Sequence, residues 1–391
     1  RLTLVTGVQT CALPIYLLEA LHKPNNLMRI LCQKINWLAE NTEYELYVVL
    51  TEQTRKPLCY ELSSKVQVIN MDVNYDELDK LPFVKRWFYH MKKQQVYRKK
   101  MGDWLVALKP QITVSLIQHD IPFLHKIKDG SHKLGEIHFK RDSGLLFSYS
   151  FFSEKINRWV TCCKQLCMLY WIKKLDSFVT DTDGSRHEWE KIVSDVCFIP
   201  NPLKEYPELA EVQDIKKVMA IGDYMPGLGL DQLIMIWERL APKYPDWRLH
   251  LYGDGELAVF KEMIKNKHLS RSVQCYSRPK DLYQLYSQYT LLVQIYNYDK
   301  FGRHLMEAMA YGLPCIAFNV PFGPDELIED EKNGFLVSPG HTTDFTSKLG
   351  LLMHDEELRL KMRQQAHISV RPYLLEVVMP RWVELFDKLS R

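Results

Sequence analysis

Two acids, Asp299 and Glu307, are separated by seven residues and open the part of the chain whose residue types best support chemistry. Asp299 is expected in a loop after a strand and Glu307 in the first turns of the next helix, so both lie at the carboxyl edge of a sheet. Phe301 and Gly302 between them let backbone N–H groups approach a ligand, and the helix start favours phosphate. A carboxylate at Glu307 can accept two hydrogen bonds from a ribose. The pattern predicts a nucleoside diphosphate site, and helix capping by solvated acids is the alternative.

Strands alternate with helices along the chain, and this alternation predicts the elements that position the two acids. Such alternation implies parallel sheets covered by helices on both faces. Two halves of similar length then make an α/β protein of two doubly wound, Rossmann-like domains that face a cleft. No GxGxxG follows a strand, so a nicotinamide or flavin cofactor is not expected. The predicted strands are Tyr44–Leu50, Val66–Met71, Ile112–Leu116, Leu134–His138, Phe178–Thr180, Val196–Ile199, Val218–Gly222, Arg248–Tyr252, Ser272–Tyr276, Leu291–Ile295 and Pro314–Phe318.

The length of the chain predicts two domains. Its 391 residues, 46% of them hydrophobic, exceed the roughly 250–300 residues that one hydrophobic core supports. We expect an N-terminal domain over residues 16–200, a C-terminal domain over 201–370, and a last helix over 371–391 that packs back towards the N-terminal domain. Residues 1–15 resemble the translation of a sequencing-library adapter, so they are left out of the fold prediction.

Charge, cysteine and hydropathy patterns narrow the partners and the compartment. The 51 Lys and Arg nearly balance the 48 Asp and Glu, which gives no reason to expect nucleic acid as a partner. Nine cysteines without CxxC spacing are typical of reduced thiols in a cytoplasmic protein. No stretch of about 18 uncharged apolar residues occurs, so no membrane-spanning helix is expected.

A basic and aromatic run from Lys85 to Lys100 holds seven Lys or Arg together with Trp87, Phe88, Tyr89 and Tyr97. One interpretation is peripheral contact with an anionic membrane, at the inner face of the plasma membrane, where lipid-linked acceptors are found. We expect instead a solvated helix face whose aromatic side chains point into the core.

Several segments together resemble glycosyltransferase family 4, the retaining nucleotide-sugar transferases with the GT-B fold. The subgroup that they resemble is the bacterial capsule and exopolysaccharide transferases of the amylovoran-biosynthesis type. The resemblance implies transfer of a hexose from a nucleoside diphosphate sugar to a glycan or lipid-linked acceptor, with retention and without a metal or cofactor. Besides the acid pair, the segments are EAMAYGLPCIAF from Glu307, GPDELI from Gly323, NGFLV from Asn333, PNNLMRILCQKINWLAE from Pro24, GEIHF from Gly135, IPNPL from Ile199 and LYGDGE from Leu251.

The resemblance also implies roles for single residues. His138 and Asp299 would contact the donor sugar, Glu307 would hold the ribose, and these three are the catalytic candidates. Outside this context, His138 could be a structural hydrogen-bonding residue and Arg278 a surface arginine. The donor-binding residues implied by the resemblance are Asn25, Asn26, Arg29, Gly222, Gly253, Arg278, Phe301, Gly302, Arg303 and His304.

Two positions depart from the family pattern. The family has an Arg directly after the first glycine of the 222–229 segment and a Lys before the last, where this chain has Asp223 and Leu228. The loss of two cations near a diphosphate weakens transition-state binding. Lys300, Arg303 and His304 could compensate, or they could point to solvent. A catalytically degenerate, nucleotide-sugar-binding homologue or partner subunit is therefore the alternative function, and a GT-B nucleotide-sugar epimerase is a weaker one.

Overall fold

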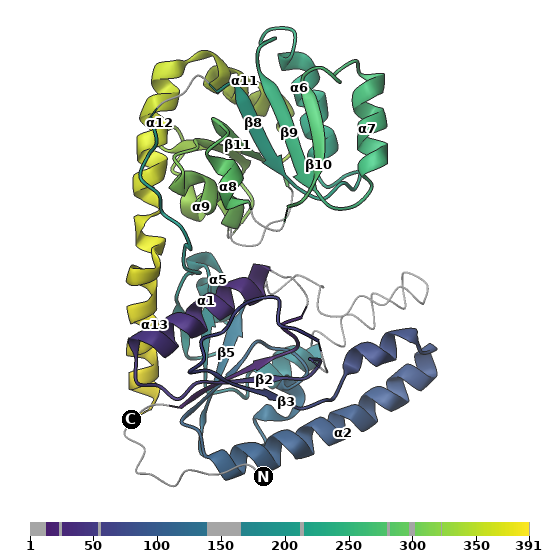
Figure 1. Ribbon diagram of the computed structural model, residues 1–391, viewed down its shortest axis with the longest axis vertical. Coiled ribbons are helices and arrows are strands. Elements are labelled where there is room, and N and C mark those ends of the chain that lie inside the picture. Colours follow the sequence, from purple (N-terminus) through teal and green to yellow (C-terminus); the bar gives the residue numbers. More distant parts are fainter. Residues whose placement is uncertain are drawn as a thin grey trace. The chain divides into compact units, whose positions relative to one another are not determined.

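Parallel strands form two separate sheets, each within one of two units of the chain (Figure 1). The computed structural model describes residues 13–22, 26–53, 56–138, 166–211, 215–279, 282–296, 302–321 and 323–390. The first unit comprises Arg1–Pro202 and Val378–Arg391, and the second comprises Leu203–Val377. The predicted fold class, two Rossmann-like α/β domains with parallel sheets, is confirmed.

The described sheet of the first unit has the strand order β3-β2-β1-β4-β5-β6-β7, and all neighbouring strands are parallel. Successive strands are added to one side of β1 and then, from β4 on, to the other side, so the topological switch point lies between β1 and β4. In open α/β sheets, ligands bind at the carboxyl ends of strands at such a point. The strands are β1 (Pro14–Leu18), β2 (Tyr47–Leu50), β3 (Gln67–Asn70), β4 (Ile112–Ser115), β5 (His132–Ile137), β6 (Ser177–Thr180) and β7 (Val196–Phe198).

Strand β1 lies at the middle of this sheet, between β2 and β4. Pro14 and Ile15 belong to β1, and together with Leu13 they are buried. The fold therefore begins before residue 16, where we expected it to start. The physical reason is that β1 supplies a pairing partner to two neighbouring strands at once.

Helices of the first unit include one that returns from the far end of the chain. The residues of α13 from Val378 onwards belong to this unit. Its Phe386 ring lies 6.5 Å from the ring of Tyr16, and the hydroxyl of Tyr44 donates a hydrogen bond to Asp387 at 2.5 Å. The helices are α1 (Asn26–Asn41), α2 (Phe83–Leu108), α3 (Ile121–Leu124), α5 (Asp183–Trp189) and α13 (Leu375–Leu389).

Three aromatic side chains of α2 that we expected to point into the core are exposed instead. Trp87, Phe88 and Tyr89 are 62%, 51% and 46% exposed, whereas Tyr97 is buried. The helix packs on its unit through Tyr97, Met101 and Leu105, which share one face at a spacing of four residues. The three exposed aromatic residues precede this face, so the prediction for them was wrong.

The described sheet of the second unit has the strand order β10-β9-β8-β11-β12-β13, again with all neighbouring strands parallel. The change of direction here lies between β8 and β11. The strands are β8 (Lys217–Ile221), β9 (Arg248–Gly253), β10 (Val273–Ser277), β11 (Leu291–Gln294), β12 (Cys315–Phe318) and β13 (Gly334–Val337). The helices are α6 (Leu230–Leu240), α7 (Leu257–Asn266), α8 (Tyr283–Tyr286), α9 (Arg303–Ala310), α10 (Pro324–Leu327), α11 (Thr342–His354) and α12 (Glu356–Ser369).

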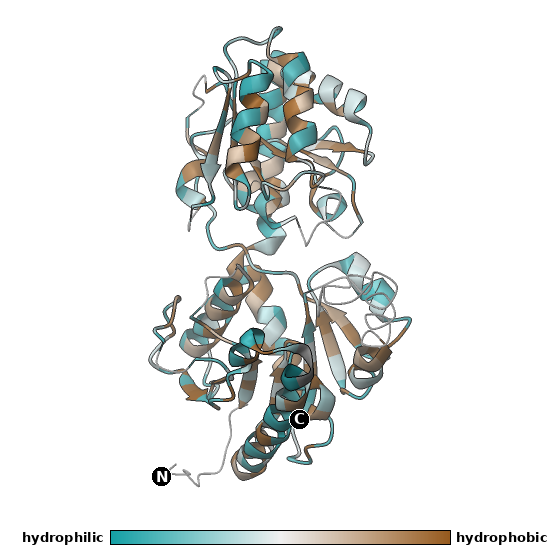
Figure 2. Ribbon diagram, turned by 90° about the vertical axis from the view of Figure 1, so that its right-hand side faces the viewer, coloured by the Kyte–Doolittle hydropathy of each residue, from teal (hydrophilic) through white to brown (hydrophobic). Residues whose placement is uncertain are grey.

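Strand β8 is apolar on both faces because each face packs against a hydrophobic cluster. Val218 and Ala220 belong to the hydrophobic cluster that contains Trp237, and Met219 and Ile221 belong to the separate cluster around α8 and α9. Successive side chains of a strand point to opposite faces, so both faces of this sheet are covered. In Figure 2 the helices mix hydrophilic and hydrophobic residues, as expected for elements with one buried side. Among the described residues, no helix is long and apolar enough to cross a lipid bilayer.

Candidate active site

The carboxyl ends of β8, β9 and β11 meet closely at one edge of the second sheet, where we predicted the donor site. A β-carbon built on Gly253 would lie 1.9 Å from the carbonyl oxygen of Gly222, and one on Gly229 would lie 2.2 Å from that of Ile295. Gly229, which precedes α6, also has a φ of 116°, a conformation that favours glycine. Gly253 and Gly229 therefore allow the close backbone approach at this edge.

Arg278 follows β10 at the same edge and is bound by two carboxylates. Its Nη2 donates a hydrogen bond to Oδ1 of Asp223 at 2.8 Å, and its Nε lies 3.2 Å from Oδ2 of Asp254. Asp223, at a position where the resembled family has an arginine, therefore offsets the charge of Arg278, which we predicted to bind the donor. A phosphate that binds Arg278 has to compete with both acids.

Glu307 is only 1% exposed and lies at the centre of a cluster formed by α8 and α9. Its Oε1 accepts hydrogen bonds from the hydroxyl of Tyr283 at 3.0 Å and from Nε of Arg303 at 2.8 Å. Its Oε2 accepts one from the hydroxyl of Tyr286 at 2.9 Å. These donors fix the direction in which the carboxylate points. The two tyrosines were missed in the sequence, because they precede Glu307 by more than 20 residues.

Arg303 and His304 both turn towards Glu307. Arg303 forms an ion pair with Glu307 across one helical turn and is only 12% exposed, and Nδ1 of His304 lies 3.6 Å from Oε2 of Glu307. The alternative in which Arg303 simply points to solvent is therefore wrong. Gly302, which precedes α9, has a φ of 41° and so brings the chain into the helix through a left-handed turn.

Several predicted site residues lie outside the described residues, namely Asn25, Asp299, Lys300 and Phe301. Of the other residues in the predicted N-terminal donor loop, Asn26 is the first residue of α1 and Arg29 is half-buried in the same helix.

His138 directly follows β5 in the first unit and contacts two acids. Its Nε2 lies 2.8 Å from Oε1 of Glu136, and its Nδ1 lies 3.4 Å from Oδ2 of Asp181. Oε1 of Glu136 also accepts a hydrogen bond from Nζ of Lys34, which comes from α1. Lys34, Glu136 and Asp181 were missed in the sequence. The signal that could have revealed Glu136 is its spacing of two from His138, which puts both side chains on one side of an extended segment.

These charges set the protonation state of His138. Burial on its own would lower the pKa of His138, but the carboxylates of Glu136 and Asp181 raise it to about 9. Burial would likewise raise the pKa of Glu136, but Lys34 and His138 lower it to about 2. His138 is therefore an imidazolium at neutral pH, with a proton on each ring nitrogen.

A second group of polar side chains lies at the carboxyl edge of the first sheet. The ligand atoms of Glu19, Glu52 and His119, which follow β1, β2 and β4, all lie within 4.8 Å of one another. The ring of His119 stacks on that of Tyr75 at 3.9 Å, and burial lowers the pKa of His119 to about 4. The group offers carboxylate oxygens and a neutral imidazole, which are suited to hydroxyl groups.

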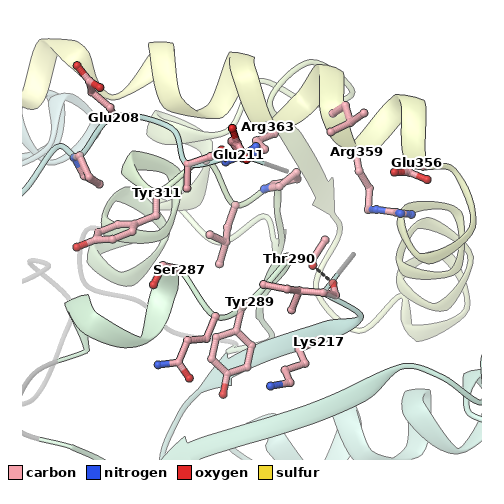
Figure 3. A pocket seen from close by; sticks show the side chains of 18 residues that line it. Glu208, Glu211, Lys217, Ser287, Tyr289, Thr290, Tyr311, Glu356, Arg359 and Arg363 are labelled. Carbon is pink, nitrogen blue, oxygen red and sulfur yellow. Dashed lines mark hydrogen bonds between the residues drawn. The ribbon is translucent and has the colours of Figure 1, made fainter. Parts of the chain in front are cut away.

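A pocket of about 620 Å³ lies at the opposite edge of the second sheet (Figure 3). Lys217 at the start of β8, Thr290 before β11 and Pro314 before β12 line it, with Arg359 and Arg363 from α12. The amino ends of the strands form this edge, so the pocket is separate from the candidate site around Glu307.

Comparisons with known proteins agree with the fold. Residues 204–368 match the family model described as "Glycosyl transferases group 1". The chain is 29% identical over 212 residues to an uncharacterized glycosyltransferase of Haemophilus influenzae, and the aligned part covers 53% of this chain and 60% of that protein. It is 30% identical over 172 residues to the amylovoran biosynthesis glycosyltransferase AmsD of Erwinia amylovora, which covers 44% of this chain and 48% of AmsD.

Among solved structures, TarM of Staphylococcus aureus has a TM-score of 0.71 at 14% identity and covers 96% of this chain and 100% of the TarM chain. The likeness to TarM therefore extends over both units, whereas the curated relatives share about half of their length with this chain. The chain accordingly has the fold of the GT-B glycosyltransferases, and its residues 204–368 match the group 1 glycosyl transferase family.

Proposed function

We propose that this protein is a glycosyltransferase that moves a hexose from a nucleoside diphosphate sugar to a hydroxyl group of a glycan or lipid-linked acceptor, with retention of configuration. The observation that carries the proposal is the buried carboxylate of Glu307 in α9, inside the region that matches the family model. Support also comes from the relatives: AmsD is named for amylovoran biosynthesis, and TarM was solved with UDP and α-GlcNAc-glycerol.

In this proposal the second unit binds the donor. Glu307 accepts hydrogen bonds from the ribose hydroxyls, while Tyr283 and Tyr286 keep its carboxylate in place. The start of α9 offers backbone N–H groups and a positive dipole end to the diphosphate as it leaves. Asp299 and the backbone of Phe301 and Gly302 contact the donor sugar. No metal or cofactor takes part in these steps.

The first unit binds the acceptor and contributes His138. The acceptor oxygen attacks the anomeric carbon on the face from which the diphosphate departs, so the configuration is retained. The bond to the diphosphate breaks as the new glycosidic bond forms, and the departing phosphate takes the acceptor proton. Negative charge grows on the phosphate in the transition state, so a nearby cation accelerates the reaction. We place the acceptor hydroxyl near Glu19, Glu52 and His119.

Calorimetric titration with UDP, followed by transfer assays with a panel of UDP- and GDP-sugars, tests the function. The Glu307→Gln variant is expected to bind UDP about tenfold more weakly, because an amide loses a charged hydrogen bond worth about 1.5 kcal/mol or more. Glu262→Gln, an exposed position on α7, is the matched control and should bind like the wild type.

Two outcomes would change the conclusion. Absence of binding heat with UDP and every sugar nucleotide, in a protein whose circular dichroism shows it folded, would remove the enzymatic function. UDP binding without turnover of any donor would instead favour the degenerate binding homologue, for which the pairing of Asp223 with Arg278 is the structural argument.

We also propose that α2 places the protein on the inner face of the cytoplasmic membrane. The helix contains seven Lys or Arg and one acid, Asp103. Lys85, Lys92 and Lys99 are exposed, and Nζ of Lys92 lies 4.6 Å from the centre of the exposed Phe88 ring. Exposed aromatic rings next to unburied lysines suit the interface of an anionic bilayer, where rings enter the headgroup region and cations meet lipid phosphates.

Sedimentation with vesicles tests the membrane proposal. Binding is expected with vesicles of phosphatidylcholine and phosphatidylglycerol, and the Lys92→Gln/Lys99→Gln double variant should bind about thirty-fold more weakly, at about 1 kcal/mol per charge. Met235→Ser, which changes an exposed hydrophobic residue on α6, is the control. The proposal would be contradicted if the double lysine variant sedimented as much as Met235→Ser, or if the wild type bound vesicles of phosphatidylcholine alone as strongly as the anionic vesicles.

A further inference from the structure

A buried network of charges surrounds His138 and draws on separate elements of the first unit. Lys34 of α1 and Glu136 of β5 are 1% and 2% exposed, and they share an ion pair. The same oxygen of Glu136, Oε1, also bonds Nε2 of His138. The ammonium of Lys34 lies 3.7 Å above the ring of Trp382 on α13, so its other side is covered by an aromatic face.

Stability alone does not account for this network. Taking charges out of water costs several kcal/mol per ion, and a well-packed apolar group of similar volume is often as stable as a buried ion pair. A buried pair does, however, fix the position and the charge of a third group that it contacts. Here that third group is His138, which lies at the carboxyl end of β5, the edge at which α/β sheets bind ligands.

We propose that Lys34 and Glu136 are positioning residues, which anchor the His138 ring through Nε2–H and keep it as an imidazolium whose Nδ1–H is offered to an oxygen of the substrate. For the identity of the substrate, a sugar nucleotide, the inference rests on the proposed function. For the state of the ring it rests on the geometry of the first unit alone.

The two nitrogens of His138 differ in how tightly they are held. Nε2 lies 2.8 Å from a carboxylate that is itself buried and pinned by Lys34, whereas Nδ1 lies 3.4 Å from Asp181. Asp181 also accepts a hydrogen bond from Asn201 at 3.1 Å, so it keeps a partner when Nδ1–H of His138 donates its hydrogen bond to a ligand instead. The side chains of His138 and Asp181 are 11% and 15% exposed, compared with 2% for Glu136. Nδ1–H is therefore the group that can donate a hydrogen bond to a ligand oxygen.

The charged groups that face His138 among the described residues account for its protonation. Glu136 from β5 and Asp181 from the segment after β6 raise the pKa of His138, against the effect of burial. Lys34 from α1 acts on Glu136, because it helps keep that carboxylate ionised. Tyr16 from β1 also faces Glu136, and burial raises its pKa well above the usual value, so it stays neutral.

Nuclear magnetic resonance of the histidine rings in the full chain tests the protonated state directly, with the His138 signal assigned through a His138→Gln variant. The wild-type ring is expected to stay protonated from pH 6 to 8 and to titrate near pH 9. In the Lys34→Met/Glu136→Gln double variant, which removes both charges of the pair together, the midpoint should fall clearly below that of the wild type, because only Asp181 is left to raise it against the effect of burial. Lys34→Met alone leaves Glu136 in place and should keep the midpoint above 8.

A functional measurement separates this positioning role from a merely structural one. Donor affinity of the wild type should fall as the pH rises through about 9, and in the double variant the same loss should occur at a lower pH, together with the shifted midpoint. A wild-type His138 that titrates near 6.5 would overturn the charged ring, and an unchanged midpoint in the double variant would overturn the role of Lys34 and Glu136 in setting its charge. A charged ring combined with pH-independent donor affinity would overturn the substrate contact. If no donor binds the wild type at all, the proposed function fails while the titration still decides the state of His138.

Discussion

The Glu136→Gln substitution is expected to lower the free energy of unfolding of the first unit by about 3–5 kcal/mol, as breaking a buried ion pair typically does. Glu136 lies between two buried cations, Lys34 and His138, and the amide leaves both without their shared carboxylate. Urea unfolding, followed by tryptophan fluorescence and circular dichroism, measures the loss. Lys34→Met should cost less, because Glu136 keeps His138 as a counter-charge.

The double variant provides the control for this prediction. Lys34→Met/Glu136→Gln should be more stable than Glu136→Gln alone, because no unpaired charge is left at the Lys34 position. Additive effects of the two substitutions would show that Lys34 and Glu136 do not stabilise each other.

The stabilisation that His138 contributes should be fully present below pH 6.5 and lost as the pH rises through about 9, since its pKa is raised in the folded state. Stability that does not change across this pH range would show that protonation of His138 does not contribute to folding.

The Gly253→Ala substitution is expected to destabilise the second unit by about 3 kcal/mol, the upper part of the usual range for overpacking. The added methyl group would lie 1.9 Å from the carbonyl oxygen of Gly222, and backbone cannot move aside as a flexible side chain can. The strand ends of β8 and β9 would have to separate at the edge where we propose the donor site. UDP affinity should therefore fall together with the melting temperature.

Gly227→Ala is the matched control for this effect. Gly227 has a φ of 83°, but nothing lies within 4 Å of a β-carbon built on it. Its substitution carries only the conformational cost of a left-handed residue, about 1 kcal/mol. Equal melting temperatures for the two variants would show that the close approach of Gly253 to Gly222 is not tight in solution.

Local pattern was sufficient to predict most of the architecture. Strand β8 could be located because it is apolar on both faces, and α9 because it ends before Gly312, which has a φ of 75°. The approximate positions of the predicted strands are confirmed. The exposure of Trp87 on α2 could not be predicted in the same way, because a helix that packs through only part of its length leaves apolar residues in solvent.

The candidate site was predictable where its residues are close in sequence and not where the fold brings distant ones together. Glu307 and Arg303 are separated by one helical turn, so their proximity follows from helix geometry. Lys34 and Glu136 are 102 residues apart, and nothing in either segment specifies the other. Their pairing depends on how α1 packs on the sheet, which a single sequence does not encode in any local pattern.

The path of the chain also has a consequence for biosynthesis. The first unit is interrupted at Pro202 and resumes only at Val378, so the whole second unit is an insertion within it. Contacts such as that between Tyr44 and Asp387, 343 residues apart, cannot form until α13 has left the ribosome. The second unit, which is continuous, can fold while translation continues, whereas Lys34 has no Trp382 ring to cover it until α13 has been synthesised.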